Sequence, residues 1–196
     1  TDGHRLARAD VDAPSGSEGM PGIIIPRKTV GELQKLIDNP ELIIGIEISD
    51  SKIRLSIGSV VLTSKLIDGT FPDYQRVIPQ ANDKEMRVDC QTFARAVDRV
   101  STISSERGRA VKLALADGQL MLTVNNPDSG SATEEVAVGY ESDAMEIGFN
   151  AKYLLDITAQ LSGEDAIFLL ADAGSPTLIR DTAGADALYV LMPMRV

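Results

Sequence analysis

One sequence pattern occurs three times in this chain, and its clearest copy reads Val88-Asp-Cys-Gln-Thr-Phe-Ala-Arg-Ala-Val-Asp-Arg-Val100. The other two copies are residues 25–37 and 149–161, so the copies begin 63 and 61 residues apart. Each copy starts with the apolar end of a strand and continues with apolar residues at three- to four-residue spacing, which is typical of a helix. The recurrence predicts a chain built from repeats of about 60 residues.

The three predicted helices begin near Thr29, Gln91 and Ala151. Each presents one apolar face, and these faces consist of Val30, Leu33 and Ile37, of Phe93, Val97 and Val100, and of Leu154, Ile157 and Leu161. Thr29 and Glu32 have the spacing of a capping box, and Asn150 is the predicted N-cap of the third helix.

Three strands are predicted after each helix. They cover residues 42–49, 52–58 and 60–67, then 110–116, 119–125 and 135–140, and finally 166–171, 177–181 and 187–192. Ile53, Leu55 and Ile57 alternate with polar residues, as in a half-buried strand. Asp117-Gly118 between two alternating runs predicts a hairpin. Each repeat therefore reads as strand, helix and three mostly antiparallel strands, which is an α+β class of fold.

One repeat of this size would be marginally stable alone, so two repeats are expected to form a domain. Counting back from Val196 predicts a complete domain at residues 77–196 and an incomplete one at residues 1–76. The incomplete domain retains a strand within residues 1–9, and residues 13–19 form a loop. We therefore expect a fragment that lacks at least half a domain upstream; the alternative is a complete chain with an incomplete set of repeats.

The composition excludes several classes of function. The chain has 196 residues and a formal charge of −10, which argues against a generally basic binder of nucleic acid or membrane. One Cys permits no internal disulfide, and one His nearly excludes zinc sites and Ser-His-Asp chemistry. No apolar run is long enough to span a membrane, and the N-terminus has no signal-peptide character. A reducing, cytoplasmic location and the absence of any cofactor are expected.

Several residue types favour packing or solvation over chemistry. Cys90 opens a predicted helix and has no identifiable base, so it reads as a packing residue. The sequence has no phosphate-binding loop with a Gly-x-x-x-x-Gly-Lys-Ser/Thr pattern. The acidic residues are not spaced as metal ligands and are predicted at hairpin ends and on the surface; they are Asp117, Asp128, Glu134, Glu135 and Asp172.

Six motifs together resemble the sliding-clamp family, the beta subunits of bacterial DNA polymerase III. They are residues 1–7 (Thr-Asp-Gly-His-Arg-Leu-Ala), 64–69, 71–74, 125–127, 145–150 and 192–195 (Met-Pro-Met-Arg). The resemblance covers essentially the whole chain, in family order and spacing. It implies the DNA-clamp fold, with helices on one face and antiparallel sheets on the other. It also implies a three-domain protomer in a head-to-tail homodimeric ring around duplex DNA, of which this chain is the C-terminal half.

The resemblance further implies a pocket for short peptides of partner proteins. The implied pocket residues are Thr1, Gly3, His4, Arg5, Leu6, Pro72, Arg76, Val77, Asn150, Tyr153, Val190, Met192, Pro193, Met194, Arg195 and Val196. By itself a lone His is usually structural, and the Met-Pro-Met-Arg-Val end reads equally as an edge strand with a loose tail. Gly3 is expected to allow close backbone approach, and Met is an adaptable lining. Gly108, Gly174 and Pro176 depart from the family pattern and leave one subsite's depth open.

The resemblance places the helices around the central hole of the ring, where cations meet phosphates without reading bases. The candidate cations on the polar helix faces are Arg27, Lys28, Lys35, Arg95, Arg99 and Lys152. A solvated amphipathic helix explains the same pattern. Thr102 and Ile103 match the edge between protomers, although a helix end that packs locally would look the same.

The sequence therefore predicts a non-catalytic processivity factor, an accessory subunit of the DNA polymerase III holoenzyme. The implied partners are duplex DNA in any sequence, the polymerase alpha and clamp-loader subunits, other clamp-binding polymerases and repair proteins, and a second protomer in the full-length protein. One alternative is a stand-alone peptide-binding adaptor without a DNA role. Another, a hydrolase using Asp and Ser, is disfavoured by the single His and the missing nucleophile motif.

Overall fold

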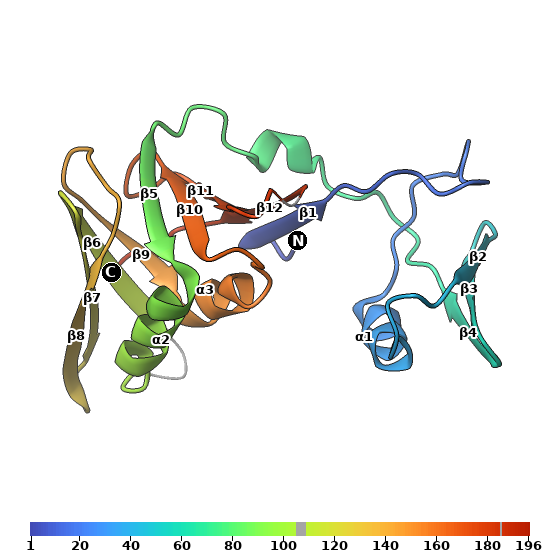
Figure 1. Ribbon diagram of the computed structural model, residues 1–196, viewed down its shortest axis with the longest axis horizontal. Coiled ribbons are helices and arrows are strands. Elements are labelled where there is room, and N and C mark those ends of the chain that lie inside the picture. Colours follow the sequence, from blue (N-terminus) through green and yellow to red (C-terminus); the bar gives the residue numbers. More distant parts are fainter. Residues whose placement is uncertain (105–108, 185) are drawn as a thin grey trace. The chain divides into compact units, whose positions relative to one another are not determined.

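The computed structural model describes residues 1–104, 109–184 and 186–196 (Figure 1). The chain divides into two compact units. The larger unit comprises Thr1–Asp12 and Asp73–Val196, and the smaller unit comprises Ala13–Pro72. Within the described ranges, no helix has the length and apolar character needed to cross a membrane.

Two antiparallel sheets and two helices make up the described part of the larger unit. The first sheet has the order β1-β12-β11-β10-β5 and the second has the order β8-β7-β6-β9. The strands are β1 (Arg5–Ala9), β5 (Lys84–Asp89), β6 (Ala110–Ala116), β7 (Gln119–Asn126), β8 (Gly130–Ala137), β9 (Met145–Asn150), β10 (Asp165–Leu170), β11 (Thr177–Asp181) and β12 (Ala187–Leu191). The helices are α2 (Cys90–Ser101) and α3 (Ala151–Thr158), and a short 3-10 helix covers Tyr74–Val77. The predicted α+β class, with helices and antiparallel sheets, is confirmed.

The helices α2 and α3 pack side by side and share one core with both sheets (Figure 1). Phe93 of α2 and Phe168 of β10 are fully buried and meet edge to face, with ring centroids 5.2 Å apart. Asp89 caps α2 by accepting a hydrogen bond from the Thr92 amide, and Asn150 caps α3 as predicted. Cys90 is buried, and burial raises the pKa of its thiol, so it packs as expected.

Short bridges join the two sheets at both ends. Arg87 of β5 exchanges two backbone hydrogen bonds with Gly139, just beyond β8. Beyond β12, the Met194 amide donates to the carbonyl of Gly148 in β9 over 2.8 Å. The last residues of the chain therefore extend the second sheet along the free edge of β9, while β6 holds the other edge.

The strand β1 belongs to the larger unit because it pairs with β12 along its whole length. The residues paired in this way are 178 to 186 positions apart in the sequence. The domain boundary between residues 76 and 77 follows the order of the chain, not this pairing, and it stays a prediction.

The smaller unit consists of α1 (Arg27–Leu36) and the antiparallel sheet β2 (Ile44–Ile48), β3 (Lys52–Ile57) and β4 (Val60–Lys65). The predicted capping box at Thr29 is wrong. Pro26 is the N-cap, its carbonyl accepts from the amides of residues 29 and 30, and the Thr29 hydroxyl lies 2.7 Å from that of Ser64. Proline is tolerated at this N-cap because its φ of −59° lies in the range that the ring fixes, and no helical hydrogen bond needs the N–H that it lacks.

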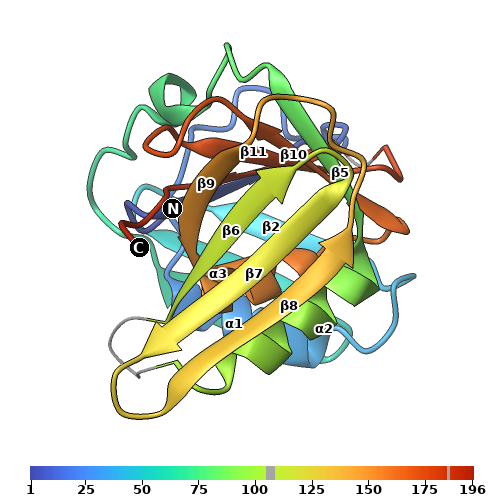
Figure 2. The same ribbon diagram turned by 90° about the vertical axis from the view of Figure 1, so that its left-hand side faces the viewer.

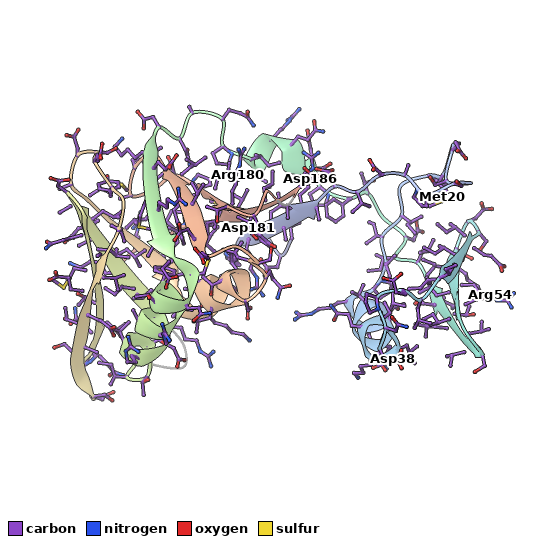
Figure 3. The ribbon with its side chains drawn as sticks, viewed as in Figure 1. Met20, Asp38, Arg54, Arg180, Asp181 and Asp186 are labelled. Carbon is purple, nitrogen blue, oxygen red and sulfur yellow. The ribbon has the colours of Figure 1, made fainter. Side chains whose placement is uncertain are left out.

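The predicted apolar face of α1 is not buried in the smaller unit. Val30 and Ile37 are 41% and 38% exposed, and only Leu33 is half-buried. Other large apolar side chains of the unit are exposed as well, among them Met20, which is labelled in Figure 3. One helix and three strands form too few layers to cover these side chains, whereas both sheets cover the corresponding faces of α2 and α3.

Two further element boundaries differ from the prediction. The strand predicted at residues 135–140 is β8, which begins at Gly130 and ends at Ala137. It begins earlier because its polar first half pairs with β7 from Asn126↔Gly130 onward, and Gly130 supplies a positive φ of 92° at the turn. Helix α3 ends at Thr158, so Leu161 follows the helix but still packs against the core.

Asp181, at the end of β11, fastens the loop that follows α3 (Figure 3). Its carboxylate accepts hydrogen bonds from the amides of Ala183, Ser162 and Gly163 at 2.7–2.9 Å and from the Ser162 hydroxyl at 3.0 Å. The hydrogen bond from the Ala183 amide, with those from the other two residues, holds the pKa of Asp181 below its usual 3.8 and outweighs partial burial. These bonds favour the ionised form.

We expect Asp181→Asn to lower the stability of the larger unit at pH 7 and to flatten its dependence on acid. A depressed carboxyl pKa gives stability that is present above the unfolded value and is lost as pH falls through the folded value, so the loss begins below about pH 4. All four tyrosines, Tyr74, Tyr140, Tyr153 and Tyr189, lie in the larger unit, and the chain has no Trp. Urea unfolding followed by tyrosine fluorescence at several pH values therefore measures this unit; Asp117→Asn, in an exposed hairpin, is the control. If the free energy of unfolding falls with acid equally in wild type and in Asp181→Asn, the Asp181 carboxylate does not supply this stability.

Candidate functional site

The pairing of β1 with β12 places the N-terminal residues beside the C-terminal end of the chain. Arg5 lies opposite Leu191 and Leu6 opposite Val190. The pairing continues beyond the strands, because the Met192 amide donates to the His4 carbonyl over 2.9 Å. Two groups of predicted pocket residues, 1–6 and 190–196, are thus adjacent.

A small apolar cluster draws the 3-10 helix to the same place. Leu6, Leu178 and Val190 are buried together, and Tyr74 and Ile78 pack against them. The predicted pocket residues Arg76 and Val77 lie between Tyr74 and Ile78 and are exposed. Arg76 forms an ion pair with Asp73 at 2.8 Å, and its side chain is 85% exposed.

A tight turn holds the first residues in place. The Asp2 carboxylate accepts hydrogen bonds from the amides of His4 and Arg5, and the Thr1 hydroxyl donates to the Arg5 carbonyl at 2.8 Å. Partial burial works to raise the pKa of Asp2, but these hydrogen bonds outweigh it and hold the pKa below its usual value. No atom of this chain comes within 4 Å of where a Cβ of Gly3 would be, so the space beside it is open, and its φ of +86° favours glycine at this position.

The Arg5 guanidinium is held by three groups. Its Nη1 lies 2.6 Å from Asp156 Oδ2, its Nε lies 3.1 Å from Asp2 Oδ2, and its Cζ lies 4.1 Å from the centre of the Tyr153 ring. Partial burial works against the charge, but the two carboxylates raise the pKa of Arg5 above its usual value. Arg5 and Tyr153, two of the implied pocket residues, therefore form one stacked surface.

The N-terminus of α3 and the tail (residues 192–196) complete the cluster. Asn150 Oδ1 accepts from the amides of Lys152 and Tyr153, so the side-chain NH2 is the part of Asn150 that remains for a ligand. Met194 bonds to Gly148, two residues before Asn150. Along the tail, Pro193 and Met194 are half-buried, whereas Met192, Arg195 and Val196 are exposed.

The structure thus links the predicted pocket residues of the larger unit through four contacts: the pairing of β1 with β12, the apolar cluster, the stacking of Arg5 on Tyr153, and the bridge from Met194 to Gly148. Pro72 belongs to the smaller unit. Gly108 lies outside the described residues. Gly174 donates its amide to Asp172 in a turn, and the Pro176 carbonyl accepts from the Asn82 side chain, which fixes that loop.

The candidate cations of the helices fall into two groups. Lys35 pairs with Glu32 at 2.9 Å, and Arg99 forms a two-pronged ion pair with Glu134 of β8. The hydrogen bonds to Glu134 raise the pKa of Arg99, and those from Arg99 lower the pKa of Glu134. Within the described ranges, no acidic partner lies within 4 Å of the exposed cations Arg27, Lys28, Arg95 and Lys152.

The predicted interface residues lie at the C-terminal end of α2. Thr102 is exposed, and its hydroxyl donates to the Asp98 carbonyl at 3.1 Å. Ile103 is half-buried against the core, and its carbonyl accepts from the Asn126 side chain at 2.6 Å. Of these two predicted interface residues, Thr102 is therefore the exposed one, whereas Ile103 is partly covered by its own unit.

Sequence reasoning missed three residues of this site. Asp2 and Asp156 hold Arg5, and Gly148 receives the tail. Asp2 precedes Gly3, a pair that often forms turns, so it carried a signal. Asp156 and Gly148 carried none, because their partners are distant in sequence.

Comparison with known proteins agrees with this arrangement. Residues 75–195 match the family model of the DNA polymerase III beta subunit, C-terminal domain, and residues 1–73 match that of its central domain. The chain belongs to the DNA polymerase III beta subunit family. The resemblance inferred from the six sequence motifs is confirmed.

Relatives within this family include the beta sliding clamp of Caulobacter vibrioides, 50% identical over 196 residues, and that of Escherichia coli K12, 40% identical over 198. All of this chain is covered in both, but only 53% of each relative, so the chain spans about half their length. Among solved structures, the sliding clamps of Bartonella birtlesii and Pseudomonas aeruginosa, both bound to griselimycin, are 63% and 40% identical, with TM-scores of 0.95 and 0.94. Each is covered over 53% of its length and matches the whole of this chain.

Proposed function

We propose that this chain is the central- and C-terminal-domain part of a DNA sliding clamp, a non-catalytic processivity factor. The observation that carries the proposal is the match of the two beta-subunit domain models over nearly the whole chain. In the full-length protein, two protomers would close head to tail around duplex DNA. A closed ring cannot leave DNA sideways, so a tethered polymerase rebinds the primer end at high effective concentration.

The cluster around β1, the tail and the start of α3 is the proposed docking site for partner peptides. Its support is the adjacency of residues 1–6, the 3-10 helix, Asn150, Tyr153 and the tail, which combines exposed apolar side chains with cationic ones. Two relatives hold griselimycin in solved structures. The proposed partners are the polymerase alpha subunit, clamp-loader subunits, and other polymerases and repair proteins that carry such peptides.

A peptide titration tests the docking site. Burying one Leu-sized anchor contributes about 1.5–3 kcal/mol, so two anchors with polar contacts give a Kd of about 1–100 μM. Isothermal calorimetry with a peptide ending in Leu-Phe should show this affinity, and the same peptide with both anchors changed to Ala should not bind. A Leu-Phe peptide that binds no better than its Ala version would refute the docking site.

The proposed DNA contacts predict a specific difference between two arginines of α2. This chain should bind duplex DNA weakly, because its net charge is −10. The binding should weaken further as salt rises, because salt competes with contacts between cations and phosphates. Arg95 has no acidic partner within 4 Å in the part of the chain that the structure describes, and replacing it by Gln should reduce the slope of log K against log salt by about 0.9 per lost phosphate contact. Arg99→Gln should change the slope less, because Arg99 is engaged with Glu134. Fluorescence anisotropy with labelled duplex measures both.

The same assignment extends to the full-length protein. Reversing the charges of Lys28 and Lys35 should reduce loading or sliding, whereas Lys112→Glu, on the sheet face and paired with Glu146, should not. Normal loading of the doubly reversed protein would show that α1 does not face DNA.

Binding to circular and linear duplex separates the clamp from the alternative function, a stand-alone peptide adaptor. In the full-length protein, a closed ring should be retained longer on circular than on linear duplex. An adaptor without a DNA role should show no difference between the two.

A further inference from the structure

We infer that Asp2 and Asp156 are positioning residues of the peptide site and make it select a neutral carbonyl over a carboxylate beside Arg5. The inference rests on the proposed docking site and deepens it. It comes from the groups around the Arg5 guanidinium, which is contacted both by the N-terminal turn and by α3.

The position of the Arg5 side chain is fixed by three contacts from two directions. Asp2 holds Nε from within the same turn, and Asp156 holds Nη1 from α3, 151 residues away in the sequence. Stacking on the Tyr153 ring fixes the plane of the guanidinium. An arginine with only one of these contacts would sample several rotamers, and ordering it would cost binding free energy.

The fixed guanidinium still has N–H groups to offer. Asp2 and Asp156 use Nε–H and one N–H of Nη1, and a guanidinium carries five N–H groups in all. The Arg5 side chain is 25% exposed, so a ligand can reach the remaining edge. Arg5 is the first residue of β1 and directly follows His4, whose carbonyl accepts a hydrogen bond from the Met192 amide.

The charge of the cluster determines which group fits this edge. One guanidinium faces two carboxylates, so the cluster carries a net charge of −1. An acidic group from a ligand would gain the Arg5 hydrogen bond but would meet repulsion from both Asp2 and Asp156. A backbone or amide carbonyl gains the bond without that repulsion. The carboxylates are 44% and 43% exposed, so solvent and salt screen the effect to about threefold in affinity.

Two peptides of one sequence test the selectivity, one ending in Leu-Phe amide and the other in Leu-Phe with a free carboxylate. The wild-type chain should bind the amide about threefold more tightly at low salt. Asp156→Asn keeps the size of the side chain and an acceptor for Arg5 but removes the charge, and it should abolish most of this preference. Glu146→Gln, which breaks the Lys112 ion pair on β6 and β9, makes the same charge change elsewhere and should leave the preference intact. Equal wild-type affinities for the two peptides would overturn the selectivity.

A double-mutant cycle separates positioning from general stability. Asp156→Asn should weaken the amide peptide about threefold in the wild-type background and should change nothing once Arg5 is replaced by Gln. Equal losses in both backgrounds would show that Asp156 acts through the fold and not through Arg5. The Arg5 Nε–H signal in the NMR spectrum of the peptide-free chain should be protected from exchange in wild type and less so in Asp2→Asn. If neither peptide binds while this signal is protected, the proposed docking site fails; if the signal is unprotected while both bind, the positioning fails.

Discussion

Deleting Met194–Val196 is expected to weaken binding of a Leu-Phe peptide by about tenfold or more, which corresponds to about 1.4 kcal/mol per decade. The tail supplies Met194 and the exposed Val196 to the proposed docking site, and one backbone hydrogen bond to Gly148 fastens it to β9. The domain should stay folded, because β6 still holds the other edge of β9 and the core lies behind it. Calorimetric titration of wild type and the truncated chain measures the difference.

Gly148→Ala should reproduce much of this loss without removing any atom of the tail. A Cβ at Gly148 would lie 2.6 Å from the Met194 carbonyl oxygen and within 3 Å of both methyl groups of Val196. The Met194 amide is the one described backbone donor that fastens the tail to β9, so the tail can move away at little cost to the core, and the peptide site moves with it. Gly139→Ala is the matched control, since its Cβ would make only ordinary contacts at 3.5 Å and beyond. If deletion of Met194–Val196 leaves the peptide affinity unchanged, the tail is not part of the docking site.

Phe93→Ala is expected to destabilise the larger unit by roughly 3–5 kcal/mol, the cost of deleting a large buried aromatic side chain. Phe93 is fully buried and packs edge to face on Phe168, so it links α2 to the first sheet. The surrounding core includes both sheets and both helices, and this leaves little freedom to collapse into the cavity.

Urea unfolding followed by tyrosine fluorescence measures this loss, since every tyrosine lies in the larger unit. Gln91→Ala, on the exposed side of the same helix, should change the free energy of unfolding by less than about 0.5 kcal/mol. A loss for Phe93→Ala no larger than that of Gln91→Ala would show that the packing around α2 is not as described.

The pattern of the sequence was informative wherever structure depends on neighbours along the chain. Helices begin within two residues of the predicted positions at Thr29, Gln91 and Ala151. The Asn150 cap and the hairpin at Asp117-Gly118 formed as predicted. Capping, turns and amphipathic periodicity act over a few residues, so the local sequence carries them. The burial predicted for the apolar face of α1 was wrong, because burial of Val30 and Ile37 depends on which other elements cover them and not on their neighbours along the chain.

For this protein the sequence by itself determined the α+β repeat, the membership in the beta subunit family, and the kinds of residue that a peptide site needs. Only the tertiary structure decided how those residues combine. It paired β1 with β12, placed Arg5 between Asp2 and Asp156 on the Tyr153 ring, and put Gly148 where the tail needs space. It also showed that Arg99 is engaged with Glu134 while Arg95 is unpaired in the described part of the chain. These are contacts between residues up to about 190 positions apart, set by strand register and core packing, which periodicity along the chain does not encode.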